Sequence, residues 1–307
     1  MKNNISKGRV LVVAGIAAVG VLIGAFYLRT VPANFVRYLI WRFTSTAFVT
    51  KGQVSVGDTD IHYVSYGSGP PVLLLHGGLS NRLSWFSQLP RLVESGRRVV
   101  LPDTRGHGDS TLGSTELSYR LFAADAATVL DRLSIEKTDV VGWSDGGNTA
   151  LLLGHYWPQR VRRMVLISAN FNPAGLTPEA QKETSEPSRG IVRWLKRWWT
   201  GAGDRLRELE IRVKRMWQTR PNLQRADLAT ITAPTLVIVG EADVVSTSHA
   251  CLMAEWLANG SLAIIAGGHF TPVTQAQRVN ELMLEFLNPV TSVGIPAPPF
   301  MNNHPSE

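Results

Sequence analysis

The chain has 307 residues, of which 44% are apolar and 18% are charged, so it can bury one large core or one core with an insertion. Its single cysteine, Cys251, excludes an intramolecular disulfide framework and a cysteine-rich metal site. The formal net charge is +7, but no recognised nucleic-acid-binding motif accompanies it, and nucleic acid is not expected as a partner.

The first thirty residues differ from the rest in composition. An uncharged run from Val10 to Leu28 follows three basic residues. Its length is close to the ~20 residues that a helix needs to cross a bilayer. We predict an uncleaved membrane anchor rather than a cleaved signal peptide, with a bacterial inner membrane as the location and lipid as a partner. Basic residues on both sides of the run leave the orientation open. Residues 34–48 mix aromatic and arginine side chains, which indicates an interfacial helix.

The positive charge is concentrated between Lys182 and Arg225. This stretch holds 12 Lys and Arg against 5 Asp and Glu, and 12 − 5 = 7 equals the excess of the whole chain. It also contains Trp194, Trp198, Trp199 and Trp217. Two interpretations stay open: a basic, aromatic face that meets anionic lipid, or a solvated helix whose tryptophans pack inward.

From residue 53 onward, strand patterns alternate with helix patterns. Strands are predicted over 53–56, 60–66, 71–75, 97–103, 138–144, 161–168, 233–240 and 261–268, and helices over 117–133, 148–156, 246–257 and 272–287. The first two strands flank Gly57-Asp58-Thr59, a hairpin signal. Several later strands are continuous apolar runs, which are typical of parallel strands covered on both faces. The alternation predicts an α/β fold with a doubly wound, mostly parallel sheet.

One long interval lacks a strand pattern. Between Ile167 and Pro234 the sequence is polar, basic and helix-forming, so we predict a helical lid inserted into the sheet domain. The predicted organisation is a membrane anchor with an interfacial segment at 1–50, a sheet-containing core at 51–170 and 231–288, the lid at 171–230, and a flexible, proline-rich tail at 289–307.

Ser144 lies between two glycines, at the turn from a predicted strand to a predicted helix. A serine hydroxyl is a weak nucleophile, so it needs a base and a group that orients the base. Ligands of doubly wound sheets sit beyond the carboxyl ends of the strands. Asp243 and His269 each follow a predicted strand, and so does the His76-Gly77-Gly78-Leu79 turn.

Other acids and histidines are weaker candidates. Asp139 precedes its strand and therefore lies at the wrong edge of the sheet, and Asp103 fits a structural turn. His76 and His107 lie in turns, where we expect them to hold loops together. His62, His155 and His249 fall within strand or helix patterns.

These motifs resemble those of the α/β-hydrolase superfamily, serine-nucleophile branch with a helical lid. The matching features are Gly142-Trp143-Ser144-Asp145-Gly146 as a G-x-S-x-G elbow, the serine–acid–histidine order and the DTRGHGDS segment at 103–110. The resemblance covers about Val54 to Leu287. It implies that Ser144 attacks a carbonyl, His269 carries the proton and Asp243 orients His269.

The same resemblance implies an oxyanion hole and a substrate contact surface. The backbone N–H of Asp145 is the first expected oxyanion donor, and the second comes from the 76–79 turn, with Gly78 favoured over Leu79. Leu79 and Trp143 are expected to contact substrate. No cofactor or metal is expected, because no metal-ligand spacing is found among the histidines and carboxylates.

Asp145 departs from many relatives, which have an uncharged residue beside the nucleophile. Its carboxylate either turns away to bond the protein, which we favour, or faces a cationic substrate group such as an amine.

Three functions remain open from the sequence. The favoured one is a serine hydrolase of carboxylic esters, thioesters or activated amides that acts through an acyl-enzyme. A carbon–carbon bond hydrolase or a cofactor-free haloperoxidase-type perhydrolase would use the same residues. A non-catalytic binding protein would be expected to lack one of them.

Overall fold

The computed structural model describes residues 30–183 and 200–288. The chain divides into two compact units, Met1–Thr46 and Ala47–Glu307. In the first unit, residues 30–44 form a helix. All the elements that follow belong to the second unit.

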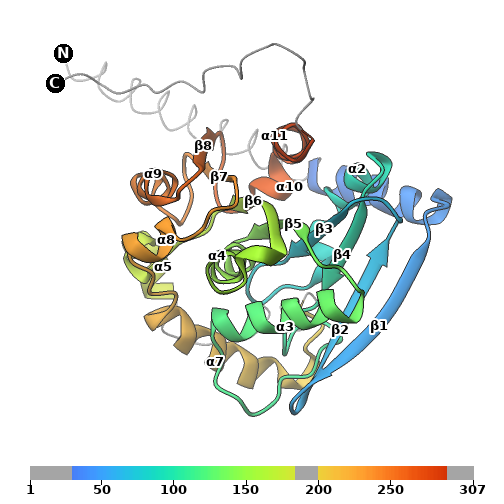
Figure 1. The fold of residues 1–307 in the computed structure, drawn as a ribbon, viewed down its shortest axis with the longest axis horizontal. Helices are drawn as coiled ribbons and strands as arrows, with labels where there is room; N and C mark the ends of the chain where they lie inside the picture. Colours follow the sequence, from blue (N-terminus) through green and yellow to red (C-terminus); the bar gives the residue numbers. More distant parts are fainter. Residues whose placement is uncertain (1–29, 184–199, 289–307) are drawn as a thin grey trace, which may run out of the picture. The chain divides into compact units, whose positions relative to one another are not determined.

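A single mostly parallel sheet forms the centre of the second unit (Figure 1). Its described strands are β1 (Val49–Val56), β2 (Thr59–Tyr66), β3 (Pro71–Leu75), β4 (Arg98–Pro102), β5 (Thr138–Trp143), β6 (Val161–Ile167), β7 (Thr235–Gly240) and β8 (Gly260–Ile265). They are ordered β1-β2-β4-β3-β5-β6-β7-β8. The β1–β2 and β2–β4 pairs are antiparallel, and every pair from β4–β3 to β7–β8 is parallel. The predicted mostly parallel sheet is confirmed.

Burial follows each strand's place in the sheet. All six residues of β5 and of β7 are buried, as expected for apolar strands with helices on both faces. The edge strand β1 instead alternates between exposed and half-buried positions. The chain reverses from β1 to β2 at Gly57, whose φ of 60° lies in the left-handed region that favours glycine.

Helices follow or separate most of the parallel strands. They are α2 (Leu89–Glu94), α3 (Tyr119–Arg132), α4 (Asp145–Tyr156), α9 (Thr247–Trp256), α10 (Thr271–Thr274) and α11 (Ala276–Leu287), with short 3-10 turns η1 (Arg82–Trp85) and η2 (Pro158–Arg160). In Figure 1, α3 and α4 lie side by side against the sheet. Serine side chains cap α3 and α9 at their N-termini, where helix N–H groups lack intrahelical partners.

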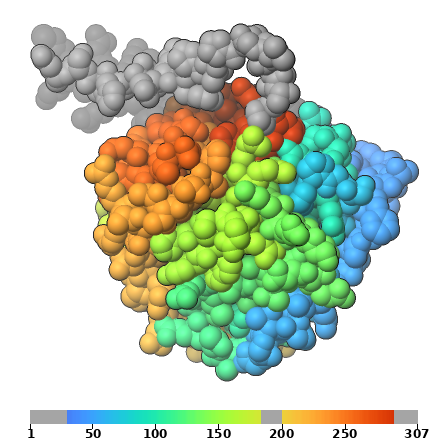
Figure 2. Space-filling model, in the orientation of Figure 1, coloured from blue at the N-terminus to red at the C-terminus, as the bar shows by residue number. Residues whose placement is uncertain are grey.

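The segment between β6 and β7 is helical in its described part. It contains η3 (Pro173–Gly175), α5 (Pro178–Glu183), η4 (Gly203–Arg205), α7 (Leu206–Thr219) and α8 (Arg225–Ala229). The longest of these, α7, buries Leu206, Leu209, Val213 and Met216, which share one face of a helix. In the space-filling view, the green surface of α4 adjoins the orange surface of the chain after β6 (Figure 2).

The predicted membrane anchor requires correction. Within residues 30–183 and 200–288, no helix combines the length and the apolar character that a bilayer crossing requires. On this finding, the membrane localisation and the lipid contact predicted for the N-terminal segment are withdrawn. The run from Val10 to Leu28 itself lies outside the described residues. The other predicted domain boundaries remain predictions.

Candidate active site

Ser144 occupies a sharp turn between β5 and α4. Its φ of 54° and ψ of −120° are unusual for a residue with a side chain, and such strain is common at functional sites. The flanking glycines permit the turn. A Cβ on Gly142 would lie 2.3 Å from the carbonyl oxygen of Gly146, and one on Gly146 would lie 1.9 Å from that of Leu75. The glycines are therefore required by close backbone packing around the serine.

The structure brings Ser144 together with the two predicted partners. The Nε2 atom of His269 lies 3.0 Å from the Oγ atom of Ser144. On the other side of the ring, Nδ1 lies 2.8 Å from Oδ1 of Asp243. Because a carboxylate oxygen accepts, Nδ1 carries the proton and Nε2 is free to accept the serine proton.

Asp243 is buried, but several donors keep its carboxylate charged. Burial raises its pKa, but the hydrogen bond and the electrostatic interaction with His269 lower it, helped by donors from Ser168 and Val245, so that the net pKa is lowered. The hydroxyl of Ser168 donates to Oδ2 at 2.5 Å, and the N–H of Val245 donates to Oδ1 at 3.2 Å. These bonds leave Asp243 suited to orient His269.

Trp143 contacts the histidine loop. Its indole N–H donates to the carbonyl oxygen of His269 at 2.9 Å, and its ring packs edge-on against Phe270 at 5.7 Å. The side chain is buried. Trp143 thus links the Ser144 turn to the loop that carries His269.

The turn at residues 76–79 lies next to Ser144 because β3 and β5 are neighbours in the sheet. A Cβ on Gly77 would lie 3.4 Å from the Cβ of Ser144. The N–H of Leu79 donates to Nε2 of His107 at 3.1 Å. The N–H of Gly78 has no hydrogen-bond acceptor within the described chain. Of the two predicted donors in this turn, only Gly78 has an N–H left for a ligand.

Asp145 is the first residue of α4, so its N–H has no acceptor within the helix. Its carboxylate accepts the hydroxyl of Tyr119 at 2.8 Å and the indole N–H of Trp217 at 2.9 and 2.8 Å. Burial raises its pKa to about 6, although the bonds from Trp217 and Tyr119 lower it. The favoured expectation, that this side chain bonds the protein, agrees with these contacts.

A cavity of about 290 Å³ opens beside Ser144 and His269. It is lined by Tyr119, Ser144, Asp145, Ser168, Asn170, Leu176, Ala180, Lys214, Trp217, Arg220, Val244, Val245, His269 and Phe270. Seven of these residues come from the segment between β6 and β7. Leu79 and Trp143, which were predicted to contact substrate, are buried and do not belong to this lining.

Comparisons with known proteins agree with this arrangement. A family model described as the alpha/beta hydrolase fold matches residues 70–201. A protein assigned as a non-heme chloroperoxidase from Synechocystis sp. is 30% identical, over 78% of this chain and 99% of its own. The chain belongs to the α/β-hydrolase fold family.

Two further proteins are similar to this α/β hydrolase over most of its length. The 2-hydroxymuconate semialdehyde hydrolase of a Pseudomonas species is 27% identical, over 75% of this chain and 90% of its own. The crystal structure of a meta-cleavage product hydrolase from Pseudomonas fluorescens superposes with a TM-score of 0.70 at 24% identity, covering 78% of this chain and 97% of the other. The known relatives are enzymes, and so is this protein.

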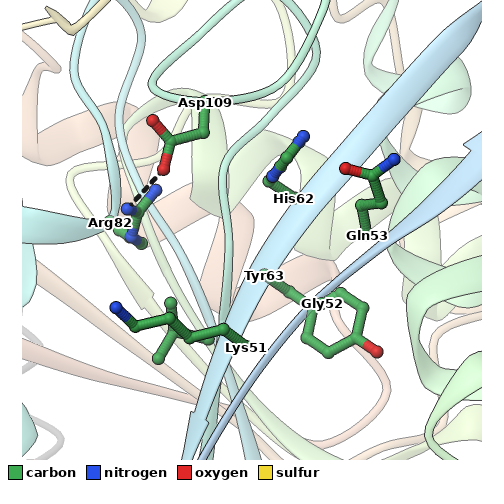
Figure 3. A pocket seen from close by; sticks show the side chains of 8 residues that line it. Lys51, Gly52, Gln53, His62, Tyr63, Arg82 and Asp109 are labelled. Atoms are coloured by element: carbon green, nitrogen blue, oxygen red, sulfur yellow. Dashed lines mark hydrogen bonds and ion pairs between the residues drawn. The ribbon is translucent and has the colours of Figure 1, made fainter.

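A second cavity, of about 310 Å³, lies away from Ser144, between β1, β2 and the ion pair of Arg82 with Asp109 (Figure 3). The guanidinium of Arg82 donates to the carboxylate of Asp109 at 2.6 Å. A dashed line marks this interaction in Figure 3. None of the residues that meet at the serine turn lines this cavity.

Several residues near the site were not predicted from the sequence. Ser168 bonds Asp243, while Tyr119 and Trp217 bond Asp145. Of the four tryptophans in the basic stretch, Trp217 turns inward, and Trp194, Trp198 and Trp199 lie outside the described residues. Across residues 30–183 and 200–288, no group of three or more His, Cys, Asp or Glu side chains could hold a metal ion.

Proposed function

We propose that this α/β hydrolase is a serine hydrolase that cleaves carboxylic esters, thioesters or activated amides through an acyl-enzyme. The observation that carries the proposal is the relay from Ser144 through His269 to Asp243, with separations of 3.0 and 2.8 Å. Such a chain of nucleophile, base and orienting acid makes a hydroxyl reactive near neutral pH.

The proposed reaction uses this geometry in two stages. The Oγ of Ser144 attacks the carbonyl carbon while Nε2 of His269 takes the hydroxyl proton. When the tetrahedral intermediate collapses, the bond to the leaving alcohol breaks and the alcohol leaves with the proton from His269. Water then attacks the acyl-serine and gives its proton to His269. The acid departs, and the proton returns to Ser144.

Two backbone N–H groups are proposed as the oxyanion hole. Gly78 supplies one, because its N–H is unused and its turn borders Ser144. Asp145 supplies the other, from the first turn of α4. Losing one such donor typically costs about 10²–10³ in turnover.

We also propose that residues 171–230 act as a lid. Leu176, Ala180, Lys214, Trp217 and Arg220 of this segment all line the cavity beside Ser144. The bond from Trp217 to Asp145 attaches α7 to the first turn of α4. A segment with this position can exclude bulk water and select the acyl group.

The test uses the purified protein, a fluorophosphonate probe and p-nitrophenyl esters. We expect the wild type to be labelled and to turn over the esters, and Ser144→Ala to do neither while it keeps the same circular dichroism spectrum. Labelling that persists in Ser144→Ala contradicts the role of this serine. The ester panel varies acyl length and includes amine-bearing esters, because Asp145 lines the cavity.

A second candidate function uses the same residues for a different reaction. The similarity to a 2-hydroxymuconate semialdehyde hydrolase and to a protein assigned as a chloroperoxidase supports a carbon–carbon bond hydrolase or a perhydrolase. Diketone substrates, and bromide oxidation with peroxide and acetate, are assayed beside the esters. A diketone or perhydrolysis rate that exceeds ester hydrolysis in the wild type and vanishes in Ser144→Ala favours this candidate.

A further inference from the structure

Two buried histidines connect the 76–79 turn to the 103–110 loop by a reciprocal exchange of hydrogen bonds. His107, from the loop, accepts the N–H of Leu79 in the turn at 3.1 Å. His76, from the turn, accepts the N–H of Thr104 in the loop at 3.0 Å. The two rings pack edge to face, with centroids 5.3 Å apart. Each loop therefore supplies an acceptor to the backbone of the other.

The hydrogen bond at Nδ1 fixes the tautomer of each ring. Nδ1 of His107 lies 3.0 Å from the carbonyl oxygen of Arg105, and Nδ1 of His76 lies 2.8 Å from that of Gly77. A carbonyl only accepts, so each Nδ1 carries the hydrogen and each Nε2 is an acceptor. Burial lowers the pKa of His107 to about 3 and that of His76 to about 4, and both rings stay neutral near neutral pH.

The position of Leu79 needs such support. Its φ of 51° lies in the left-handed region, where a side chain crowds the backbone. Residues persist in this region when surrounding contacts hold them there. The bond to His107 occupies the N–H of Leu79 and fixes the backbone immediately after Gly78.

A different set of contacts anchors the rest of the loop. Asp103 forms an ion pair with Arg82 and accepts the N–H groups of Arg82 at 2.9 Å and of Asp109 at 3.0 Å. These bonds lie beyond the 76–79 turn in sequence. A substitution at Arg82 can therefore loosen the 103–110 loop and still leave His107 as the acceptor of the Leu79 N–H. Such a variant provides a matched control.

We propose that His107 is a positioning residue of the oxyanion hole. By accepting the N–H of Leu79, its Nε2 holds the 76–79 turn so that the N–H of Gly78 stays directed at the oxygen of the tetrahedral intermediate. The residue acts through the backbone and does not touch the substrate. The inference rests on the proposed serine hydrolase function and assigns a role within it to a histidine outside the Ser144–His269–Asp243 relay.

The experiment compares three variants in steady-state ester hydrolysis. His107→Leu removes the acceptor, His107→Gln supplies an amide oxygen in its place, and Arg82→Gln loosens the loop elsewhere. We expect His107→Leu to lower kcat about 10-fold to 100-fold with KM within about 2-fold, because the loss affects only the transition state. His107→Gln should recover most of kcat, and Arg82→Gln should keep kcat while melting at a lower temperature.

A second measurement uses an alkyl trifluoromethyl ketone, whose adduct with the serine carries an oxyanion. Its affinity should fall in His107→Leu by the same factor as kcat. The proposal is overturned if kcat is unchanged in His107→Leu, or if Arg82→Gln loses as much turnover. In contrast, a wild type whose ester hydrolysis equals that of Ser144→Ala rejects the proposed function itself.

If His107→Leu does not fold, the tautomer of the wild type decides. Side-chain ¹⁵N spectra of the full chain should show His107 neutral, with the hydrogen on Nδ1, between pH 5 and 8. Protonation of Nε2 in this range means that the ring cannot accept the N–H of Leu79, and it overturns the proposal.

Discussion

The indole N–H of Trp217 donates to both carboxylate oxygens of Asp145, at 2.9 and 2.8 Å. The two residues are 72 positions apart in the sequence. Trp217 lies on α7 and Asp145 follows Ser144, so this contact joins the inserted segment to the Ser144 turn. A Cβ on Gly78 would lie 2.2 Å from Oδ2 of Asp145 and 2.7 Å from the indole. Only glycine at position 78 therefore leaves room for the pair.

Trp217→Phe is expected to weaken this attachment while keeping an aromatic ring in place. The buried carboxylate loses one of its two donors, which costs about 1–3 kcal/mol. We expect a lower urea midpoint and a raised KM for esters, because α7 lines the cavity through Trp217. Urea unfolding and ester kinetics measure the two effects. Phe35→Leu, an aromatic change in the helix at 30–44, is the control, and equal effects in both variants contradict the prediction.

Asp145→Asn is expected to change how stability depends on pH. The pKa of Asp145 is raised from 3.8 to about 6 in the folded protein, chiefly because the group is buried. The folded state thus favours the protonated acid: its contribution to stability is fully present below pH 3.8 and is lost as pH rises through 6. At 1.36 kcal/mol per pKa unit, the loss is about 3 kcal/mol. An asparagine side chain does not titrate in this pH range, so it makes no such pH-dependent contribution.

The free energy of unfolding of Asp145→Asn should therefore increase, relative to the wild type, between pH 4.5 and pH 8. Urea denaturation across this range measures the difference. Glu116→Gln, at an exposed carboxylate, serves as the control and should show no such trend. Parallel curves for the wild type and Asp145→Asn would contradict the raised pKa.

The order of the strands explains why the sequence predicted the central relay. Ser144, Asp243 and His269 each follow a parallel strand, and parallel strands end at the same edge of the sheet. The turn after β3 reaches the same place because β3 lies between β4 and β5, where the chain switches direction. Strand periodicity and residue order therefore carry enough information for these positions.

The side-chain partners could not be predicted in the same way. The proposed choice of Gly78 over Leu79 as an oxyanion donor depends on His107, which lies 28 positions from Leu79 and reaches it only through the folded loop. Trp143 was expected to face the substrate, but its N–H bonds the carbonyl of His269, 126 positions away. Pattern and spacing assign a residue to an element; they do not specify which distant polar atom satisfies its hydrogen-bonding group.

Ser168 is the clearest of these unpredicted partners, because its hydroxyl donates to the carboxylate that orients His269. Ser168→Ala removes this bond and keeps the backbone, whose φ is 54°. A hydrogen bond to a charged group contributes about 1.5–3 kcal/mol, and about 1.4 kcal/mol corresponds to a tenfold change in rate. We expect kcat to fall about 10-fold, because Asp243 then holds the imidazole less firmly. Ester kinetics of Ser168→Ala beside Ser95→Ala, which loses a hydroxyl bond at the end of α2, test this. A kcat equal to that of Ser95→Ala would show that Asp243 needs no support from Ser168.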